Sequence, residues 1–547
     1  MSSAMPVEGA NFHLEPRQKA EILGAILLAL FLFALDQTVV GTALPRIITD
    51  LHGENLYTWS VTVYLLTATI SGPIYGKLSD LYGRRPIFIW ALGLFLLASI
   101  GAGLSGEMWQ FILFRGLQGL GGGAVFPIAL AVIADLYPPE ERAKYGAFFG
   151  AIFGLSSVLG PTLGGLVTDN LSWHWIFFIN APIAAISLFV CWRLLPPIKH
   201  PEVGRDIDYI GAGLFAAAIA PILIGLTNRQ TQPSWTDPSV GGAIVAGLAI
   251  LAVFLWWETR AKDPIVHLAL FRNRSFTIAV AGMFLAAFGF FGAVIFLPRW
   301  FQVVHGMGAT ESGLNMLALV GALIVGATVS GQVVARTGHY KWLIFGAMVI
   351  LAAGLYLMTG LSADTPVPTL WLWMAITGLG IGPSFAVFTV VVQNSVAPKF
   401  VGIATASLTF FQQIGGTIGL TLAGVALADS IQRELPPRLL ANGVPQQFVD
   451  QFSGNPGAAG GQQLDLTGTG DLGARILAQV PAQFQALVQP LIPGIVQAIH
   501  EALAVSIGST FVIGIVAAAL AAVFVLFMQE QPMTAAAPSG ELVAGPM

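Results

Sequence analysis

Residues 76–86 read GKLSDLYGRRP, and they separate two apolar runs at 57–77 and 86–105. A run of about 20 residues is what an α-helix needs to cross the hydrocarbon core of a bilayer. The segment between the runs carries Asp80, Arg84 and Arg85, whose charges favour a position outside that core. This stretch therefore predicts two membrane helices joined by a short polar loop.

The same pattern extends along the whole chain. Apolar runs long enough to span a bilayer recur, separated by charged or Pro/Gly-rich segments. Fourteen are expected, at 22–44, 57–77, 86–105, 109–134, 145–168, 174–195, 208–228, 240–257, 276–298, 311–334, 342–361, 369–392, 402–428 and 502–527. The predicted fold is an all-α integral membrane protein with 14 transmembrane helices.

The composition agrees with a membrane protein. Of 547 residues, 55% are hydrophobic and 10% are charged, against about 25% charged in soluble domains. This excludes a soluble enzyme, and the net charge of −4 without a basic block argues against nucleic-acid binding. The single cysteine, Cys191, excludes an intramolecular disulfide or a cysteine-based metal site. We expect no metal and no catalytic residues.

The distribution of Lys and Arg predicts the orientation. Most of the 24 basic residues fall in alternate segments, beginning with the N-terminal one. Cytoplasmic loops retain positive charge. The prediction is a multi-pass protein of the cell (cytoplasmic or inner) membrane with both termini in the cytoplasm.

An internal repeat divides the chain. Leu44-Pro45-Arg46 recurs as Leu297-Pro298-Arg299, and glycines of the second, fourth and fifth spans recur in order at nearly the same offset. Two pseudo-symmetric six-helix bundles with two inserted linker helices are expected, an arrangement found in one class of secondary transporter. The expected parts are an N-terminal segment (1–21), a first bundle (22–195), a linker with helices seven and eight (196–275), a second bundle (276–528) and a tail (529–547).

One carboxylate and one guanidinium lie deep in the spans. Asp36 falls inside the first run and Arg115 inside the fourth, whereas no histidine is deep. Inserting a charged side chain at the centre of a membrane helix costs about 2.5 to 3.5 kcal/mol or more, so each of the two is expected to have a structural or functional role. Asp36 is the predicted protonatable group, and Arg115 is its partner. The alternative is an ion pair that only holds two helices together.

The second bundle lacks both charges. Asp36 corresponds to Gly289 in the repeat, and Arg115 corresponds to about Met374. Ion coupling is therefore expected in the first bundle. Amide and aromatic side chains suit a lipophilic ligand, although each Phe can equally pack against helices or lipid. The predicted substrate-binding residues are Gln37, Tyr64, Gln118, Phe288, Phe291, Asn315, Phe388, Gln412 and Gln413.

The glycines of the fourth span allow two interpretations. A phosphate-binding loop is one, but no strand precedes the glycine-rich stretch 116–123. Close helix packing is the better one, because Gly119/Gly123, like Gly160/Gly164, are small residues four apart.

Three motifs together resemble the major facilitator superfamily. They are the loop at 76–86, Arg115-Gly116 in the fourth span, and LGPTLGG at 159–165 in the fifth. The stretch LDQTVV at 35–40 and the fourteen spans narrow the resemblance to the fourteen-helix drug:proton antiporter family. In that family the fifth-span motif is characteristic of exporters.

The resemblance implies roles for residues. Asp36 would accept the proton and Arg115 would modulate it. The expected cytoplasmic gate is Gly76, Asp80, Gly83, Arg84, Arg85, Asp135 and Arg142, and the expected helix-packing motif is Gly160, Pro161, Gly164 and Gly165. The family often has a basic residue where this chain has Leu81. The alternative for the loop charges is that they only anchor it at the lipid headgroups.

A long segment at 429–500 is expected to be an outer loop. Its middle, about 453–471, has the composition of a flexible linker. Apolar residues from Phe484 to Ile499 recur at helical spacing, and Pro490 and Pro493 predict a break into two short helices. This stripe is expected on the outer membrane surface or over the mouth of a cavity; a tolerated insertion is the alternative.

The sequence thus predicts a proton-coupled exporter that works by alternating access. Its expected substrates are lipophilic, cationic or zwitterionic small molecules, including drugs and antibiotics. Its driving force is the proton gradient, with no cofactor, and it is expected to be a monomer. The alternatives are a dedicated exporter of one metabolite, lipid or siderophore, and a non-transporting membrane receptor.

Overall fold

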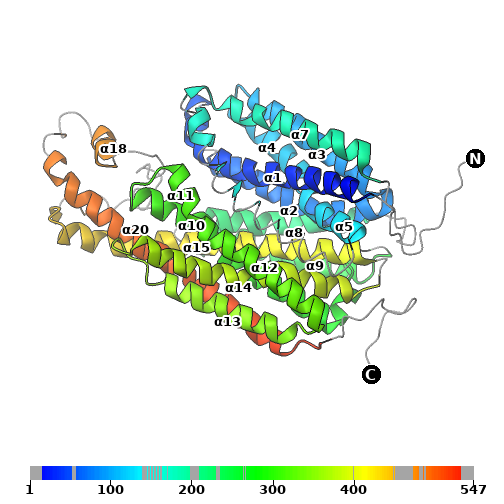
Figure 1. The fold of residues 1–547 in the computed structure, drawn as a ribbon. Coiled ribbons are helices and arrows are strands. Elements are labelled where there is room, and N and C mark those ends of the chain that lie inside the picture. The colour runs from blue at the N-terminus through cyan, green and yellow to red at the C-terminus, as the bar shows by residue number, and fades with distance from the viewer. Residues whose placement is uncertain are drawn as a thin grey trace, which may run out of the picture.

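The computed structural model shows that every regular element in the described part of the chain is a helix (Figure 1). The description leaves out residues 1–14, 52–56, 138–144, 197–207, 230–233, 450–471, 480–484 and 531–547, and shorter gaps, most of them between 146 and 169. The helices form two groups that follow one another in the sequence, so the all-α prediction is confirmed.

The first group contains six described helices, which pack on one another. They form the upper, blue-to-cyan part of Figure 1. In chain order they are α1 (Pro16–Asp50), α2 (Tyr57–Tyr82), α3 (Arg84–Gly103), α4 (Met108–Gly122), α5 (Val125–Leu136) and α7 (His174–Leu194).

The second group shares one large apolar core. Its long helices are packed around α10, α14 and α15. In chain order they are α10 (Arg274–Val303), α11 (Ala309–Asn315), α12 (Leu317–Thr337), α13 (Lys341–Met358), α14 (Val367–Asn394), α15 (Val401–Ala441) and α20 (Ile492–Leu526). Two short elements, α18 (Leu472–Gln479) and the 3-10 turn η5 (Gln489–Leu491), precede α20.

Two helices connect the groups. They are α8 (Tyr209–Asn228) and α9 (Ala243–Glu258), with the π-turn η2 (Pro238–Gly242) before α9 and the 3-10 turn η3 (Leu268–Arg272) after it. The pair packs on itself, and α8 also contacts α2 and α15. The Phe215 ring lies 5.4 Å from the ring of Phe254 and 4.9 Å from that of Phe410. Helix α8 therefore covers the junction where α2 and α15 meet, and α9 packs on α8.

Twelve helices of the described residues are long and apolar enough to cross a membrane. Two of the fourteen expected spans are not among them. The span expected at 57–77 lies in the helix α2, and much of the one expected at 145–168 lies outside the described residues. The number fourteen therefore stays a prediction.

Exposed tryptophans mark both ends of the helices. Trp109 and Trp175 lie at the beginnings of α4 and α7, and Trp90 and Trp342 lie near the beginnings of α3 and α13, which start at the opposite end. All four are more than half exposed. Tryptophan is enriched at the two interfaces of a bilayer, so these positions fit helices embedded in lipid. The described chain enters α1 and leaves α20 at the same end of the molecule (Figure 1).

Two expected spans are divided. The span expected at 109–134 consists of α4 and α5, which are separated at Gly123 and Ala124, and the span expected at 311–334 consists of α11 and α12, which are separated at Met316. Glycine has no side chain to hold a regular helix together by packing, which favours a break in the first case. Hydropathy reports only that a segment is apolar, so neither break was predicted.

The expectation that 429–500 is a loop is wrong at both ends. Helix α15 continues to Ala441, and α20 begins at Ile492. Glu434 and Arg438 form an i,i+4 ion pair on the extension of α15, which stabilises a helix outside the hydrocarbon. A drop in hydropathy therefore marked where the apolar part ends, and not where the helix ends.

The apolar stripe of this segment was also placed wrongly. Pro493 lies in the first turn of α20, where proline is tolerated because its missing N–H is not needed. Ile495 and Ile499 are buried in the core of the second group. They are therefore part of a core helix, not of a surface helix or a lid. The expected flexible middle, 453–471, and Phe484 lie outside the described residues.

Candidate functional site

Asp36 is the centre of a buried polar network in the first group. It lies on α1 and is 1% exposed. Its Oδ2 accepts a hydrogen bond from Arg115 Nη1 at 2.6 Å, and its Oδ1 accepts one from Gln118 Nε2 at 2.7 Å. Arg115 Nη1 also donates to Gln118 Oε1 at 2.7 Å. The spacing of three residues places Arg115 and Gln118 on one face of α4, so one helix supplies both partners.

Sequence reasoning missed two members of this network. Asn180 on α7 donates through Nδ2 to Asp36 Oδ1 at 3.1 Å and to Ser99 Oγ on α3 at 3.0 Å. Both are buried. Asn180 lies in the middle of an otherwise apolar run. Its depth within the apolar run is the signal that could have identified it.

The Arg115 guanidinium has a second favourable contact. Its Cζ lies 4.0 Å from the centre of the Tyr64 ring on α2, within the range of a cation–π interaction. Gln37, the neighbour of Asp36, is half-buried. The structure thus brings Asp36, Arg115, Gln118 and Tyr64 together at the junction of α1, α2 and α4.

The charges balance within the network. A buried carboxylate is expensive unless a cation and hydrogen bonds compensate it, and here three donors reach the two oxygens of Asp36. Protonation of Oδ2 would turn an acceptor into a donor and leave the guanidinium without its counter-charge. The hydrogen bonds of the charged carboxylate thus join α1 to α4 and α7.

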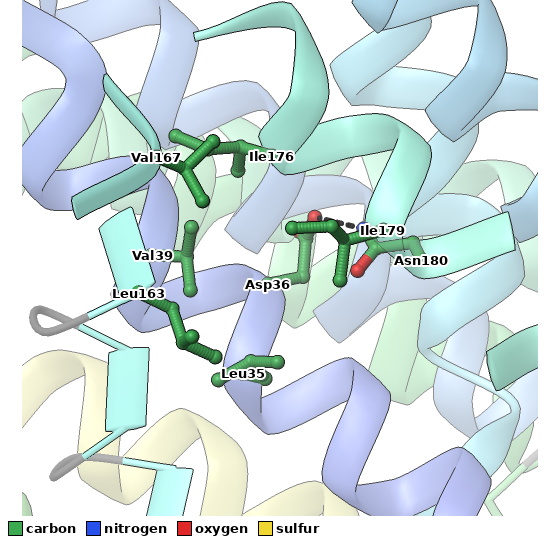
Figure 2. A pocket seen from close by; sticks show the side chains of 8 residues that line it. All are labelled: Leu35, Asp36, Val39, Leu163, Val167, Ile176, Ile179 and Asn180. Carbon is green, nitrogen blue, oxygen red and sulfur yellow. Dashed lines mark hydrogen bonds between the residues drawn. The ribbon is translucent and has the colours of Figure 1, made fainter. Parts of the chain in front are cut away.

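A small cavity adjoins the carboxylate. It is lined by Asp36 and Asn180 among apolar side chains from α1 and α7 and from residues 163 and 167. Figure 2 shows the hydrogen bond between the two polar residues at its edge. Its size is about what one water molecule requires.

The predicted aromatic residues of the second group pack against glycines. A Cβ on Gly282 would lie 2.5 Å from the ring of Phe388, one on Gly416 would lie 2.5 Å from that of Phe291, and one on Gly419 would lie 2.6 Å from the Cα of Phe288. Phe388 is fully buried. These contacts agree with the alternative interpretation, which is helix packing. A role of the three residues in substrate binding stays a prediction.

The predicted amides of the second group lie in different places. Asn315 Oδ1 accepts from Trp371 Nε1 at 2.7 Å, and Asn315 Nδ2 donates to the Glu311 carbonyl at 2.8 Å, so it joins α11 to the beginning of α14. Gln413 is half-buried. Gln412 is buried and lines a second small cavity.

The loop at 76–86 is built around Arg84. This side chain is 1% exposed and forms an ion pair with Asp80. Arg84 Nε also donates to Asp135 Oδ2 at the end of α5, at 3.0 Å, and Arg84 Nη1 donates to Ser79 Oγ at 2.6 Å. Two carboxylates from separate helices thus share one guanidinium.

The other predicted gate residues have different surroundings. Gly83 has φ +104°, a backbone conformation that favours glycine, and its repeat counterpart Gly338 has φ +69°. Gly76 is buried and its carbonyl accepts from Ser79 Oγ at 2.8 Å. Arg85 is half-buried, and Arg142 lies outside the described residues.

Leu81 gives the loop its contact with the second group. It packs against the apolar core of that group, and α2 and α5 both contact α15. The leucine that departs from the family pattern therefore makes an apolar contact between the two groups.

The fifth-span motif touches α1 near Asp36. A Cβ on Gly160 would lie 2.0 Å from Thr38 Oγ1, and that hydroxyl donates to the Ser156 carbonyl at 2.9 Å. Gly164 is buried, Gly165 faces open space, and Pro161 lies outside the described residues. Gly160 thus allows a close approach two residues after the carboxylate.

Gly119 of α4 and Gly123, which directly follows α4, have a packing role. A Cβ on Gly119 would lie 2.4 Å from the Tyr64 carbonyl oxygen, and one on Gly123 would lie 2.3 Å from that of Ala68. Both atoms belong to α2. The structure agrees with close helix packing here and shows why no side chain fits.

The sequence was compared with known proteins. The family model of the Major Facilitator Superfamily matches residues 26–420. The multidrug transporter protein MdtP of Bacillus subtilis is 35% identical over 519 residues, which cover 93% of this chain and 92% of the relative. The tetracenomycin C resistance and export protein of Streptomyces glaucescens is 32% identical over 423 residues, covering 77% and 78%.

The solved structures support the fold. A proton:xylose symporter of the major facilitator superfamily aligns with a TM-score of 0.53 at 16% identity, covering 87% of this chain and 97% of the symporter. At this identity the match concerns the fold alone.

Proposed function

The chain belongs to the major facilitator superfamily, and on this premise we propose that it is a proton-coupled exporter of lipophilic small molecules. It is a multi-span membrane transporter and not an enzyme, because the family and its relatives are transporters. The names of a multidrug transporter and of an antibiotic export protein among its relatives support export.

The observation that carries the proposal is the Asp36 network. In this network the buried carboxylate of Asp36 accepts hydrogen bonds from one guanidinium and two side-chain amides. The donor–acceptor distances are 2.6 to 3.1 Å. We infer that Asp36 accepts the proton. Arg115 then loses its counter-charge and keeps only Gln118 Oε1 and the Tyr64 ring. A shift of α4 relative to α1 follows, and this couples protonation to the alternation of access.

The finer assignments belong to the same proposal. The chain is a member of the fourteen-helix drug:proton antiporter family, with α8 and α9 as its linker helices. It lies in the cell membrane with both termini in the cytoplasm, works as a monomer without a cofactor, and takes cationic or zwitterionic substrates. Arg84, Asp80 and Asp135 close the cytoplasmic side.

The test is efflux from proteoliposomes under an imposed pH gradient. A gradient of about one pH unit sustains about a tenfold substrate gradient when one proton exchanges for one molecule. We expect Asp36→Asn to abolish this uphill accumulation of a lipophilic dye and to retain downhill movement of the same dye. The matched control is Glu21→Gln, which changes an exposed carboxylate of the same helix and should leave transport unchanged. Full proton-driven accumulation by Asp36→Asn would refute the assignment.

A dedicated exporter is the second candidate. The relative named for tetracenomycin C favours it. Competition among chemically unrelated dyes separates the two: mutual inhibition supports a broad drug exporter, and inhibition by one chemical class supports a dedicated one.

A further inference from the structure

A second cavity lies between the two groups of helices, away from the residues that surround Asp36. Phe126 and Leu130 of α5 form one wall. The other wall includes Met283 of α10, Phe385 of α14 and Gln412 of α15. Like the cavity beside Asp36, it has about the size that one water molecule requires. A single polar group of a larger molecule would therefore fill it and, because the walls come from different groups, would contact both.

Gln412 has an unused acceptor in this cavity. Its side chain is 4% exposed, and its Oε1 is buried without a hydrogen-bond partner. Other buried amides of the described chain are paired: Gln118 and Asn180 with Asp36, and Gln393 with Thr405. A buried polar atom without a partner is destabilising, so its presence points to a partner that is not part of the protein.

The surroundings restrict the chemistry of that partner. The side chains lining the cavity carry no charge. Thr389, which also lines it, donates its hydroxyl to the Phe385 carbonyl at 2.7 Å. Phenylalanine and methionine offer an apolar, polarisable surface that suits aromatic rings. The site therefore offers an acceptor oxygen within an apolar surface, and no ionic partner.

We propose that Gln412 Oε1 accepts a hydrogen bond from an N–H or O–H group of the transported molecule, so that export favours lipophilic molecules carrying such a donor. The inference rests on the proposed exporter function and specifies its substrate class. A molecule without a donor would leave the oxygen unpaired, and polar sites discriminate by this means more strongly than apolar ones.

The test compares two lipophilic monocations in proteoliposomes under an imposed pH gradient. Ethidium carries two aromatic amino groups, and tetraphenylphosphonium carries no N–H or O–H. Gln412→Leu removes the acceptor, and Gln412→Glu retains one. Ser407→Ala is the matched control, because its buried hydroxyl on the same helix bonds to the Ile403 carbonyl at 2.9 Å.

We expect Gln412→Leu to lower kcat/KM for ethidium about three- to tenfold, as for the loss of one hydrogen bond, with tetraphenylphosphonium efflux unchanged. Gln412→Glu should retain ethidium efflux, and Ser407→Ala should change neither. Unchanged ethidium efflux in Gln412→Leu, as expected if the amide binds only water, would overturn the inference.

An equal loss of efflux for both dyes would also overturn the inference. Gln412→Met, whose side chain has a similar shape to glutamine, must then give the same equal loss. Tetraphenylphosphonium efflux reports that each variant is folded. If the wild-type protein transports neither dye nor any other lipophilic compound, the proposed exporter function fails instead.

Discussion

The two groups of helices differ at corresponding positions: the first has charged and polar side chains where the second has glycine or apolar side chains. Asp36 of α1 contacts Asn180 of α7, whereas its repeat counterpart Gly289 of α10 contacts Gly514 of α20, where an added Cβ would lie 2.9 Å from the Gly289 Cα. One group brings two helices together through a charge network, and the other does so through close backbone approach. The same architecture thus contains a buried charged network in one group and close apolar packing at the corresponding place in the other.

The neighbours follow the same division. Arg115 corresponds to the fully buried Met374. The Thr377 hydroxyl of the second group bonds to the Trp373 carbonyl of its own helix at 2.9 Å and lies 3.9 Å from Met358 Sδ of α13. Gln118 of the first group instead bonds to the carboxylate of Asp36 on another helix. A symmetric fold therefore does not imply two coupling sites.

The largest effect is expected when a carboxylate is introduced into the second group at Gly289, the position that corresponds to Asp36. Gly289→Asp would bury a carboxylate next to Gly514, without a cation. The Cβ of the new side chain would lie 2.7 Å from Leu355 Cδ1. An uncompensated buried charge costs about 3 to 5 kcal/mol, so we expect no folded protein by size-exclusion chromatography. Gly292→Ala is the control on the same helix, because nothing lies within 4 Å of its added Cβ. A wild-type yield of Gly289→Asp would contradict the comparison.

A second test removes the cation from the first group. Arg115→Met should lower the free energy of unfolding by about 3 to 5 kcal/mol, since the Asp36 carboxylate loses its counter-charge. Adding Asp36→Asn should restore part of this loss. The double-mutant cycle is measured by thermal unfolding in detergent. Additive losses would mean that the two charges do not interact.

A smaller effect is expected from the amide of α7. Asn180→Leu removes one donor to Asp36 and one to Ser99, which should cost about 1 to 3 kcal/mol. Thr377→Val in the second group should cost less, because that hydroxyl bonds to a carbonyl of its own helix and its partner on another helix is the weak acceptor Met358 Sδ. Both are measured as changes in unfolding temperature. The reverse order would show that Asn180 is not part of the network.

The smallest effect is expected from Glu530, a carboxylate near the surface that contacts the turn before α13. In the second group Glu530, which follows α20, accepts from the backbone N–H groups of Tyr340 and Lys341 at 2.6 and 3.2 Å and lies 3.3 Å from His339 Nδ1. Burial raises the pKa of Glu530, but these contacts outweigh burial and lower the pKa below its ordinary 4.5. Its stabilisation is therefore present above about pH 4.5 and lost as the pH falls through the lower, folded-state pKa.

Glu530→Gln should accordingly cost less than about 1 kcal/mol near neutral pH, because His339 is exposed. The difference from the wild-type unfolding temperature should vanish in acid. A difference that grows as the pH falls would contradict this sign.

Much of the fold was predictable because bilayer crossing depends on composition. Apolar length identified the helices, and repeated glycines such as Gly83 and Gly338 identified the internal symmetry, since only glycine readily adopts their positive φ. The ends of α15 and α20 were not predictable in this way. Their extensions are helical through side-chain pairs and core packing, which hydropathy does not measure.

The site was predictable in part for the same reason. Asp36 and Arg115 stood out as charges in apolar runs, where a charge is costly. Asn180 and Ser99 did not, because a neutral polar residue in a span is less costly and its partner is distant in sequence. The aromatic residues were ambiguous, since Phe288, Phe291 and Phe388 fit equally a binding surface and close packing against glycines. The structure shows the packing, and their role in substrate binding stays a prediction.

The sequence by itself determined a helical membrane protein, its internal repeat, and the placing of its deep charge in one half. These follow from local quantities: apolar length, charge and glycine spacing. Only the tertiary structure decided that side chains of α4 and α7 meet Asp36 of α1, that α8 covers the junction of α2 and α15, and that Gln412 has an unpaired oxygen between the groups. The physical reason is that hydrogen bonds and packing depend on distances between residues far apart in the chain, and a hydropathy pattern carries no such distances.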